Sequence, residues 1–163
     1  MFSERLINLA LLVSDEARQS RQKIVTAESC TGGLVAALFT HLAGSSDVFE
    51  RGFVTYSNRA KQEMLNVPGD MLADFGAVSE PVARMMAEGA LAESRANISV
   101  AVTGIAGPGG GTGMKPVGTV HFACARENRA VRHEVRQFGD IGREDVRLAS
   151  VEVALELIRA QLA

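Results

Sequence analysis

Hydrophobic positions along the chain follow two periodicities, one typical of helices and the other of buried strands. Apolar residues recur at helical spacing from Phe2 to Val13 and again over residues 34–42. Between them, residues 23–27 form a short, mostly apolar run that predicts a buried strand. The same reasoning predicts strands over residues 49–56, 97–103, 117–125 and 130–137, and helices over 57–65, 79–93 and from about 140 to the C-terminus.

The order of these elements predicts the fold class. Strands and helices alternate along the chain, and the last two strands form a predicted hairpin joined through Glu127 and Asn128. We therefore expect a three-layer α/β/α sandwich with a mixed, mostly parallel sheet. A length of 163 residues suits one domain, which we expect to span residues 1–163.

Composition and charge narrow the range of partners. Hydrophobic residues make up 47% of the chain and charged residues 22%, as in ordinary globular proteins. The formal net charge is -2 and no basic stretch is present, which argues against a nucleic-acid partner. Asn8 interrupts the N-terminal apolar run, so this run predicts neither a signal peptide nor a membrane span.

The cysteines and histidines do not predict a metal site. Cys30 and Cys124 lack CxxC spacing and any disulfide framework, which fits a reducing compartment, and we expect a cytoplasmic protein. No zinc-type spacing links His41, His121 and His133, which we interpret as structural or exposed.

The first candidate site is the segment SCTGG, where the first predicted strand meets the next helix. Ligands of open α/β folds bind at the carboxyl ends of strands, and free N–H groups at a helix N-terminus can stabilise an oxyanion or a phosphate. Alternatively, Ser29 or Thr31 merely caps the helix. The spacing alone leaves both interpretations open. The residues of this segment are Ser29, Cys30, Thr31, Gly32 and Gly33.

A second candidate is the glycine-rich segment 104–118, which holds seven of the chain's 16 glycines. Such a loop can surround a ligand with backbone amides, although a flexible connection is the alternative. It is not a phosphate-binding loop of the Walker type, because Met114 precedes Lys115 and no Ser or Thr follows. It also lacks GxGxxG, so we expect no ATP or NAD cofactor.

Two further candidates carry charge or hydroxyl groups. Tyr56, the only tyrosine, ends a predicted strand, and Lys61 lies about one and a half helical turns beyond it. A lone lysine on a helix is usually a solvated charge, which is the alternative here. Arg143 and Arg147 are spaced i,i+4 at the start of the last helix, where they repel each other and oppose the helix dipole. This arrangement favours an anion such as phosphate between them.

Taken together, these segments resemble the CinA C-terminal domain family over nearly the whole chain. The segments that carry the resemblance are AESCTGG (27–33), GFVTYSN (52–58) with Lys61, GAVS (76–79), TGIAGP (103–108) and KPVGTV (115–120). The resemblance implies hydrolysis of the carboxamide of nicotinamide mononucleotide to nicotinate mononucleotide and ammonia. It also indicates the stand-alone form, without the N-terminal domain of larger members. One departure is that Ile141 and Gly142 separate Asp140 from Arg143, which leaves the role of Asp140 open.

The resemblance implies a role for each candidate residue. Ser29 would be the nucleophile and Lys61 the general base, with Tyr56 and Thr103 orienting these groups or the pyridine ring. The implied substrate-binding residues are Cys30, Thr31, Gly32, Gly33, Gly104, Gly107, Gly109, Gly110 and Arg143. We expect a small-molecule nucleotide substrate, no cofactor and a homo-oligomer. The alternatives are a non-catalytic nucleotide-binding module, and an amidase for another small amide with Cys30 as nucleophile.

Overall fold

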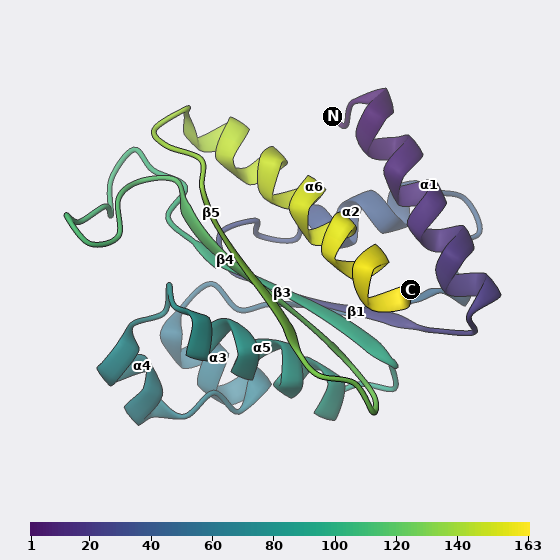
Figure 1. Ribbon diagram of the computed structural model, residues 1–163, viewed down its shortest axis with the longest axis horizontal. Helices are drawn as coiled ribbons and strands as arrows, with labels where there is room; N and C mark the ends of the chain where they lie inside the picture. Colours follow the sequence, from purple (N-terminus) through teal and green to yellow (C-terminus); the bar gives the residue numbers. More distant parts are fainter.

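The computed structural model describes residues 1–163 and places helices on both faces of a five-stranded sheet (Figure 1). The strands are β1 (Ile24–Glu28), β2 (Phe49–Val54), β3 (Ile98–Gly104), β4 (Thr119–Arg126) and β5 (Arg132–Gln137). The helices are α1 (Glu4–Gln19), α2 (Leu34–His41), α3 (Asn58–Leu65), α4 (Gly69–Phe75), α5 (Glu80–Ala92) and α6 (Arg143–Leu162), with a short 3₁₀ turn at Ser45–Asp47.

The sheet has the strand order β2-β1-β3-β4-β5. β1 pairs in parallel with β2 and with β3, β4 is antiparallel to β3, and β5 is antiparallel to β4. β4 is thus the only strand that runs against the others. The expected mixed, mostly parallel sheet of an α/β/α sandwich is confirmed.

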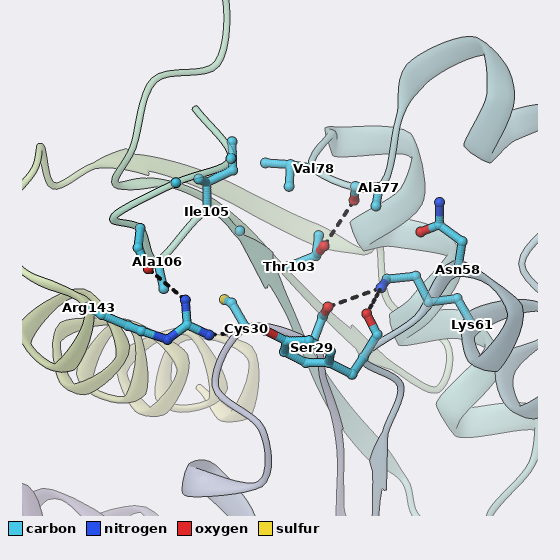
Figure 2. Close-up of a pocket in the computed structure, with 15 residues that line it drawn as sticks. Ser29, Cys30, Asn58, Lys61, Ala77, Val78, Thr103, Ile105, Ala106 and Arg143 are labelled. Carbon is cyan, nitrogen blue, oxygen red and sulfur yellow. Dashed lines mark hydrogen bonds between the residues drawn. The ribbon is translucent and has the colours of Figure 1, made fainter. Parts of the chain in front are cut away.

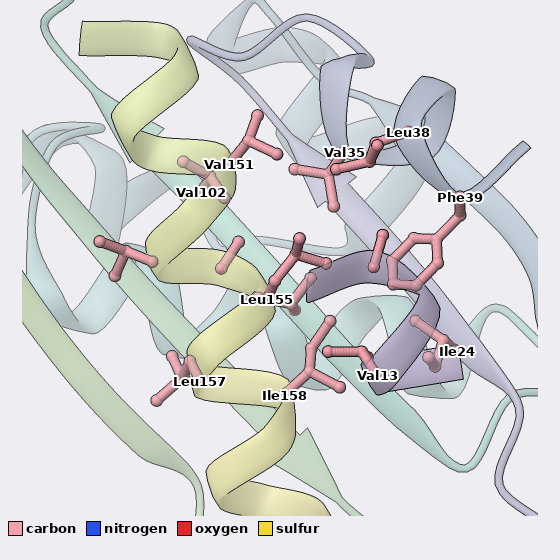
Figure 3. Packing of buried hydrophobic residues seen from close by; sticks show 14 of the residues in the cluster. Val13, Ile24, Val35, Leu38, Phe39, Val102, Val151, Leu155, Leu157 and Ile158 are labelled. Carbon is pink, nitrogen blue, oxygen red and sulfur yellow. The ribbon is translucent and has the colours of Figure 1, made fainter. Parts of the chain in front are cut away.

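Each face of the sheet has its own hydrophobic core. α1, α2 and α6 cover one face, where Leu155 and Ile158 of α6 pack among residues such as Val13 and Phe39 (Figure 3). α3, α4 and α5 cover the other, around Leu65 and other buried residues of these helices. The central strands β1 and β3 are buried on both sides, which explains their nearly continuous apolar sequence. None of the helices combines the length and hydropathy needed to cross a membrane.

The structure differs from the sequence prediction in element bounds and in one helix. α4 was not predicted, because it has seven residues and buries only Leu72, which leaves little helical periodicity to detect. α6 begins at Arg143 rather than near residue 140, and β2 ends at Val54, two residues before Tyr56. The predicted N-cap of α5 is confirmed, since the Ser79 hydroxyl accepts a hydrogen bond from the Val82 amide.

The contact between α5 and α3 depends on Gly89. A Cβ atom at this position would overlap the carbonyl oxygen of Leu65. In an exposed helix, Gly→Ala stabilises by about 1 kcal/mol, but here we expect Gly89→Ala to lower the free energy of unfolding by roughly 1–3 kcal/mol. Urea denaturation measures this, with Glu88→Ala, an exposed neighbour on α5, as control. A Gly89→Ala variant as stable as the wild type would contradict this packing.

Candidate active site

The carboxyl ends of β1, β2 and β3 meet at one edge of the sheet, beside a cavity of about 260 Å³ (Figure 2). Parallel strands direct their carboxyl ends to the same side, which is where ligands of open α/β folds bind. Fifteen residues line the cavity: Ser29, Cys30, Tyr56, Asn58, Lys61, Ala77, Val78, Thr103, Gly104, Ile105, Ala106, Gly107, Gly109, Gly110 and Arg143.

Ser29 and Lys61 are in direct contact in this cavity. Ser29 follows the last residue of β1, and Lys61 lies in the first turns of α3, which Ser57 caps. The Lys61 Nζ atom is 3.0 Å from the Ser29 Oγ atom. It is also 3.0 Å from the carbonyl oxygen of Thr55 and 3.4 Å from that of Tyr56.

The surroundings of Lys61 disfavour the charged form of its amine. The residue is only 1% exposed, and no carboxylate forms an ion pair with it. Burial lowers the pKa of the Lys61 amine, because the charged form loses its hydration. A neutral amine has two N–H groups for the carbonyls of Thr55 and Tyr56, and one lone pair that can accept the Ser29 hydroxyl proton. Ser29 and Lys61 therefore have the geometry of a nucleophile and its general base.

Cys30 adjoins Ser29 but has a different environment. Its side chain belongs to the hydrophobic core on the α6 side of the sheet. Burial raises the pKa of the Cys30 thiol to about 12, so the thiol is protonated near neutral pH. Because only the thiolate is strongly nucleophilic, this environment opposes a role for Cys30 as the attacking group.

Arg143 forms the wall of the cavity opposite Lys61, with Ser29 between them (Figure 2). Its guanidinium donates to the carbonyl oxygen of Gly107 at 2.6 Å and to the Tyr56 hydroxyl at 3.0 Å. No acidic side chain pairs with Arg143, so its positive charge is available to an anionic ligand.

The glycine-rich loop lines the cavity, but the space around its individual glycines differs. A Cβ atom on Gly104 would lie 2.7 Å from Val120, and one on Gly107 would lie 2.6 Å from Val117. These two positions need glycine because the chain behind them is close. Gly109 has no atom within 4 Å of a Cβ position and is open to the cavity. Gly110 also lines the cavity.

Thr103 connects two segments around the cavity. Its hydroxyl donates to the carbonyl oxygen of Ala77 at 2.9 Å, linking the end of β3 to the segment before α5. The hydroxyl is thus engaged with the backbone, while Thr103 itself lines the cavity.

Three residues predicted to bind substrate do not line the cavity. Thr31 is fully buried, and Gly32 and Gly33, with φ angles of 58° and 104°, form the turn into α2. The N-terminus of α2 is also occupied, because the buried carboxylate of Glu28 accepts from the amides of Val35 and Ala36 at 2.9 and 3.1 Å. These helix-terminal amides are therefore unavailable to a ligand.

Sequence reasoning missed Glu28 and Asn58 as residues of this region. Glu28 ends β1 and caps α2, and Asn58 begins α3 and lines the cavity. Both lie in the segments that carry the family resemblance, which is the signal that could have identified them. An acidic residue at the end of a strand and an asparagine after a serine cap are otherwise unremarkable in a sequence.

The paired arginines of α6 do not share one site. Only Arg143 lines the cavity, whereas Arg147 donates to the carbonyl oxygens of Cys30 and Thr31. The expectation of an anion held between both guanidinium groups is therefore wrong. Away from the cavity, His121 and His133 are hydrogen-bonded to each other at 2.9 Å across β4 and β5.

Comparison with known proteins places the chain among CinA-related sequences. A model of the CinA C-terminal domain matches residues 7–162. The nicotinamide-nucleotide amidohydrolase of Escherichia coli K12 is 47% identical over 99% of this chain and 97% of its own length. A CinA-like protein of Mycobacterium sp. strain JLS is 52% identical over 93% of this chain, which spans only 36% of that relative. The crystal structure of the competence/damage inducible protein CihA from Agrobacterium tumefaciens has a TM-score of 0.96 and 51% identity, covering 98% of this chain and 97% of that one.

The buried amine predicts a pH-dependent stability. Burial lowers the pKa of Lys61 in the folded state, whereas in the unfolded chain the pKa is about 10.4. Between these values the unfolded chain binds more protons, so the stability of the wild type rises with pH in this window. Lys61→Met removes this dependence. We expect the stability of this variant relative to the wild type to be greatest below the folded pKa and to decrease as the pH approaches about 10.4.

Urea denaturation from pH 7 upward measures this difference. Lys23→Met is the matched control, because the Lys23 amine is hydrogen-bonded at the surface and its removal should change the profile much less. A difference between Lys61→Met and the wild type that stays constant across the range would contradict a desolvated amine.

Proposed function

Because the chain belongs to the CinA C-terminal domain family, we propose that it is an amidohydrolase that converts nicotinamide mononucleotide to nicotinate mononucleotide and ammonia. The contact between the buried Lys61 amine and the Ser29 hydroxyl carries this proposal. The name and near-complete coverage of the Escherichia coli relative support the choice of substrate.

In the first half of the reaction, the Ser29 oxygen attacks the carboxamide carbon while its proton moves to the Lys61 Nζ atom. The electrons of the C=O bond move to the oxygen, which becomes an oxyanion. Collapse of this intermediate breaks the C–N bond, and Lys61 returns the proton to the leaving nitrogen, which departs as ammonia. Ser29 is left as an ester of the nicotinate product.

In the second half, a water molecule attacks the ester and gives a proton to Lys61. Collapse of the second intermediate breaks the bond to the Ser29 oxygen, which recovers the proton from Lys61. The net reaction consumes one water and one amide and produces one acid and ammonia. Lys61 thus acts alternately as base and acid, which requires a pKa well below that of a solvated lysine.

The cavity has suitable surfaces for the remainder of a nicotinamide mononucleotide. Val78 and Ile105 line it above Ser29 and would flank the pyridine ring (Figure 2). Arg143 would bind the 5′-phosphate, because its guanidinium has five N–H groups and the protein uses only part of them. The open side of Gly109 leaves room for the ribose.

Each alternative function leaves part of the site unexplained. A nucleotide-binding module without catalysis would not need a desolvated lysine on a serine hydroxyl. An amidase with Cys30 as nucleophile would need a thiolate, which burial disfavours. The expected homo-oligomeric state stays a prediction.

Three variants test the assignment of nucleophile and base by ammonia release from nicotinamide mononucleotide. We expect Ser29→Ala to be inactive, and Lys61→Arg to retain below about a thousandth of wild-type kcat, because arginine does not deprotonate. Cys30→Ala should retain a substantial fraction of activity. An inactive Cys30→Ala with an active Ser29→Ala would reverse the assignment. Near-normal activity of Lys61→Arg would make Lys61 a fixed charge instead of a base.

Arg143→Ala tests the phosphate site. A charge-assisted hydrogen bond to a phosphate contributes roughly 1.5–3 kcal/mol, so kcat/KM for nicotinamide mononucleotide should fall about tenfold or more, mainly through KM. Arg143→Lys keeps the charge and should lose less. Free nicotinamide, which lacks the phosphate, is the control substrate. If Arg143→Ala lowers kcat/KM equally for both substrates, Arg143 does not bind the phosphate.

A further inference from the structure

The nucleophile turn, residues 29–32, is held from behind by Arg147 of α6. The Gly32 amide donates to the Ser29 carbonyl oxygen at 3.0 Å and closes a four-residue turn. The Arg147 Nε atom donates to the carbonyl oxygen of Cys30 at 3.1 Å, and its Nη2 atom to that of Thr31 at 3.2 Å. One guanidinium therefore forms hydrogen bonds with two consecutive carbonyl groups of the turn that contains Ser29.

The Cys30 carbonyl belongs to the central peptide of this turn. Types I and II of a β-turn differ in the orientation of this peptide, and type II requires a positive φ at its third residue. Thr31 does not have a positive φ, so the carbonyl points as in a type I turn. The Cys30 oxygen accepts no hydrogen bond other than that of Arg147. Without Arg147, this partly buried carbonyl would lose its only hydrogen-bond partner and the peptide could rotate.

The guanidinium of Arg147 has no acidic partner. Arg18, Arg84 and Arg159 each form an ion pair with an acidic side chain, whereas Arg147 forms none. A Cβ atom on Gly32 would lie 3.3 Å from Arg147 Nη2, so the guanidinium packs closely against the turn. A guanidinium without an ion-pair partner is thus fixed directly behind Cys30, the residue that follows Ser29.

The backbone amide of Cys30, which lies in the nucleophile turn, is available to a ligand in the cavity. Cys30 lines the cavity, and its backbone N–H donates to no group of the protein. The amide that follows a nucleophilic serine is a typical donor to the oxyanion of acyl transfer. Its direction depends on the conformation of the turn, and hence on the contacts that fix the turn.

On the basis of the proposed amidohydrolase function, we propose that Arg147 is a positioning residue that keeps the nucleophile turn in its reactive conformation. By fixing the carbonyls of Cys30 and Thr31, it maintains the Ser29 hydroxyl on Lys61 and the Cys30 amide toward the substrate oxygen. Arg147 does not line the cavity, so this role affects the reaction rate and leaves substrate binding unchanged.

Steady-state kinetics with nicotinamide mononucleotide test this role. Arg147→Met keeps an unbranched side chain but removes the charge and both hydrogen bonds. Loss of one oxyanion donor lowers kcat by about 10²–10³-fold, and we expect misorientation of the turn to cost about tenfold to a hundredfold in kcat, with KM changed less than about twofold. Arg147→Lys, which can reach only one carbonyl at a time, should lie between Arg147→Met and the wild type.

Arg159→Met is the matched control. Arg159 is the same residue type on the same helix, paired with Glu16 at the far end of α6. We expect its kcat to equal that of the wild type. The affinity of each variant for nicotinate mononucleotide, measured by calorimetry, shows whether the cavity is still formed.

A second readout is independent of the substrate. A fluorophosphonate reacts with an activated serine: the Ser29 oxygen bonds to phosphorus, fluoride leaves and the serine proton moves to Lys61. The phosphoryl oxygen takes the place of the oxyanion. We expect Arg147→Met to be labelled at Ser29 at least about tenfold more slowly than the wild type and Arg159→Met.

These two readouts separate the inference from the proposed function. If the wild type is labelled but releases no ammonia from nicotinamide mononucleotide, the substrate assignment fails, and labelling alone decides on Arg147. Unchanged kcat and labelling in Arg147→Met would overturn the positioning role. So would a loss of product affinity equal to the loss of kcat, because Arg147 would then support the cavity as a whole.

Discussion

The contact between a buried amine and a serine hydroxyl is the constraint on which the site depends. An ammonium group in this position has lost its water and gained no carboxylate, so burial lowers the pKa of the Lys61 amine. The two carbonyls that hold it belong to Thr55 and Tyr56, directly beyond the end of β2 at Val54. Because the ladder between β1 and β2 ends there, these oxygens are free of strand pairing. The strand that ends early thus supplies the two acceptors, and α3, which starts at Asn58, brings the amine to them.

The side chains of Ser29 and Cys30 lie in different environments at the end of β1. Ser29 and Cys30 are adjacent in the chain, yet the hydroxyl faces Lys61 while the thiol lies in the core between the sheet and α6. Burial raises the pKa of the thiol and lowers that of the amine, since in each case the charged form is disfavoured. The same physical effect therefore disfavours the thiolate of Cys30 and favours a lysine amine able to accept a proton beside Ser29.

Sequence periodicity was sufficient for the layers of this fold but not for the roles of individual polar residues. The strands, their order of appearance and the apolar face of α6 follow from hydrophobic spacing, because burial of these residues is what the pattern records. The spacing of Lys61 alone left open whether it is a solvated charge, since only the packing of α3 against the ends of β1 and β2 shows that it is buried. The occupied N-terminus of α2 and the burial of Thr31 could not be predicted either, because the first depends on the carboxylate of Glu28 and the second on tertiary contacts.

The two arginines at the start of α6 show how a locally unfavourable pattern can be stable in the folded chain. Positive charge near a helix N-terminus opposes the dipole, and residues four apart repel each other when they have the same charge. In the structure, Arg143 donates to Gly107 and Arg147 to Cys30 and Thr31, so each guanidinium is stabilised by carbonyl oxygens of a different loop. Residues four apart on a helix differ by only about 40° in direction. Arg143 nevertheless reaches the cavity and Arg147 does not, because Arg143 is the first residue of α6 and lies one turn closer to its N-terminus. The N-terminal part of α6 therefore contacts both the glycine-rich loop and the nucleophile turn. The hydrogen bonds of Arg143 and Arg147 to these two segments offset the repulsion between the two guanidinium groups.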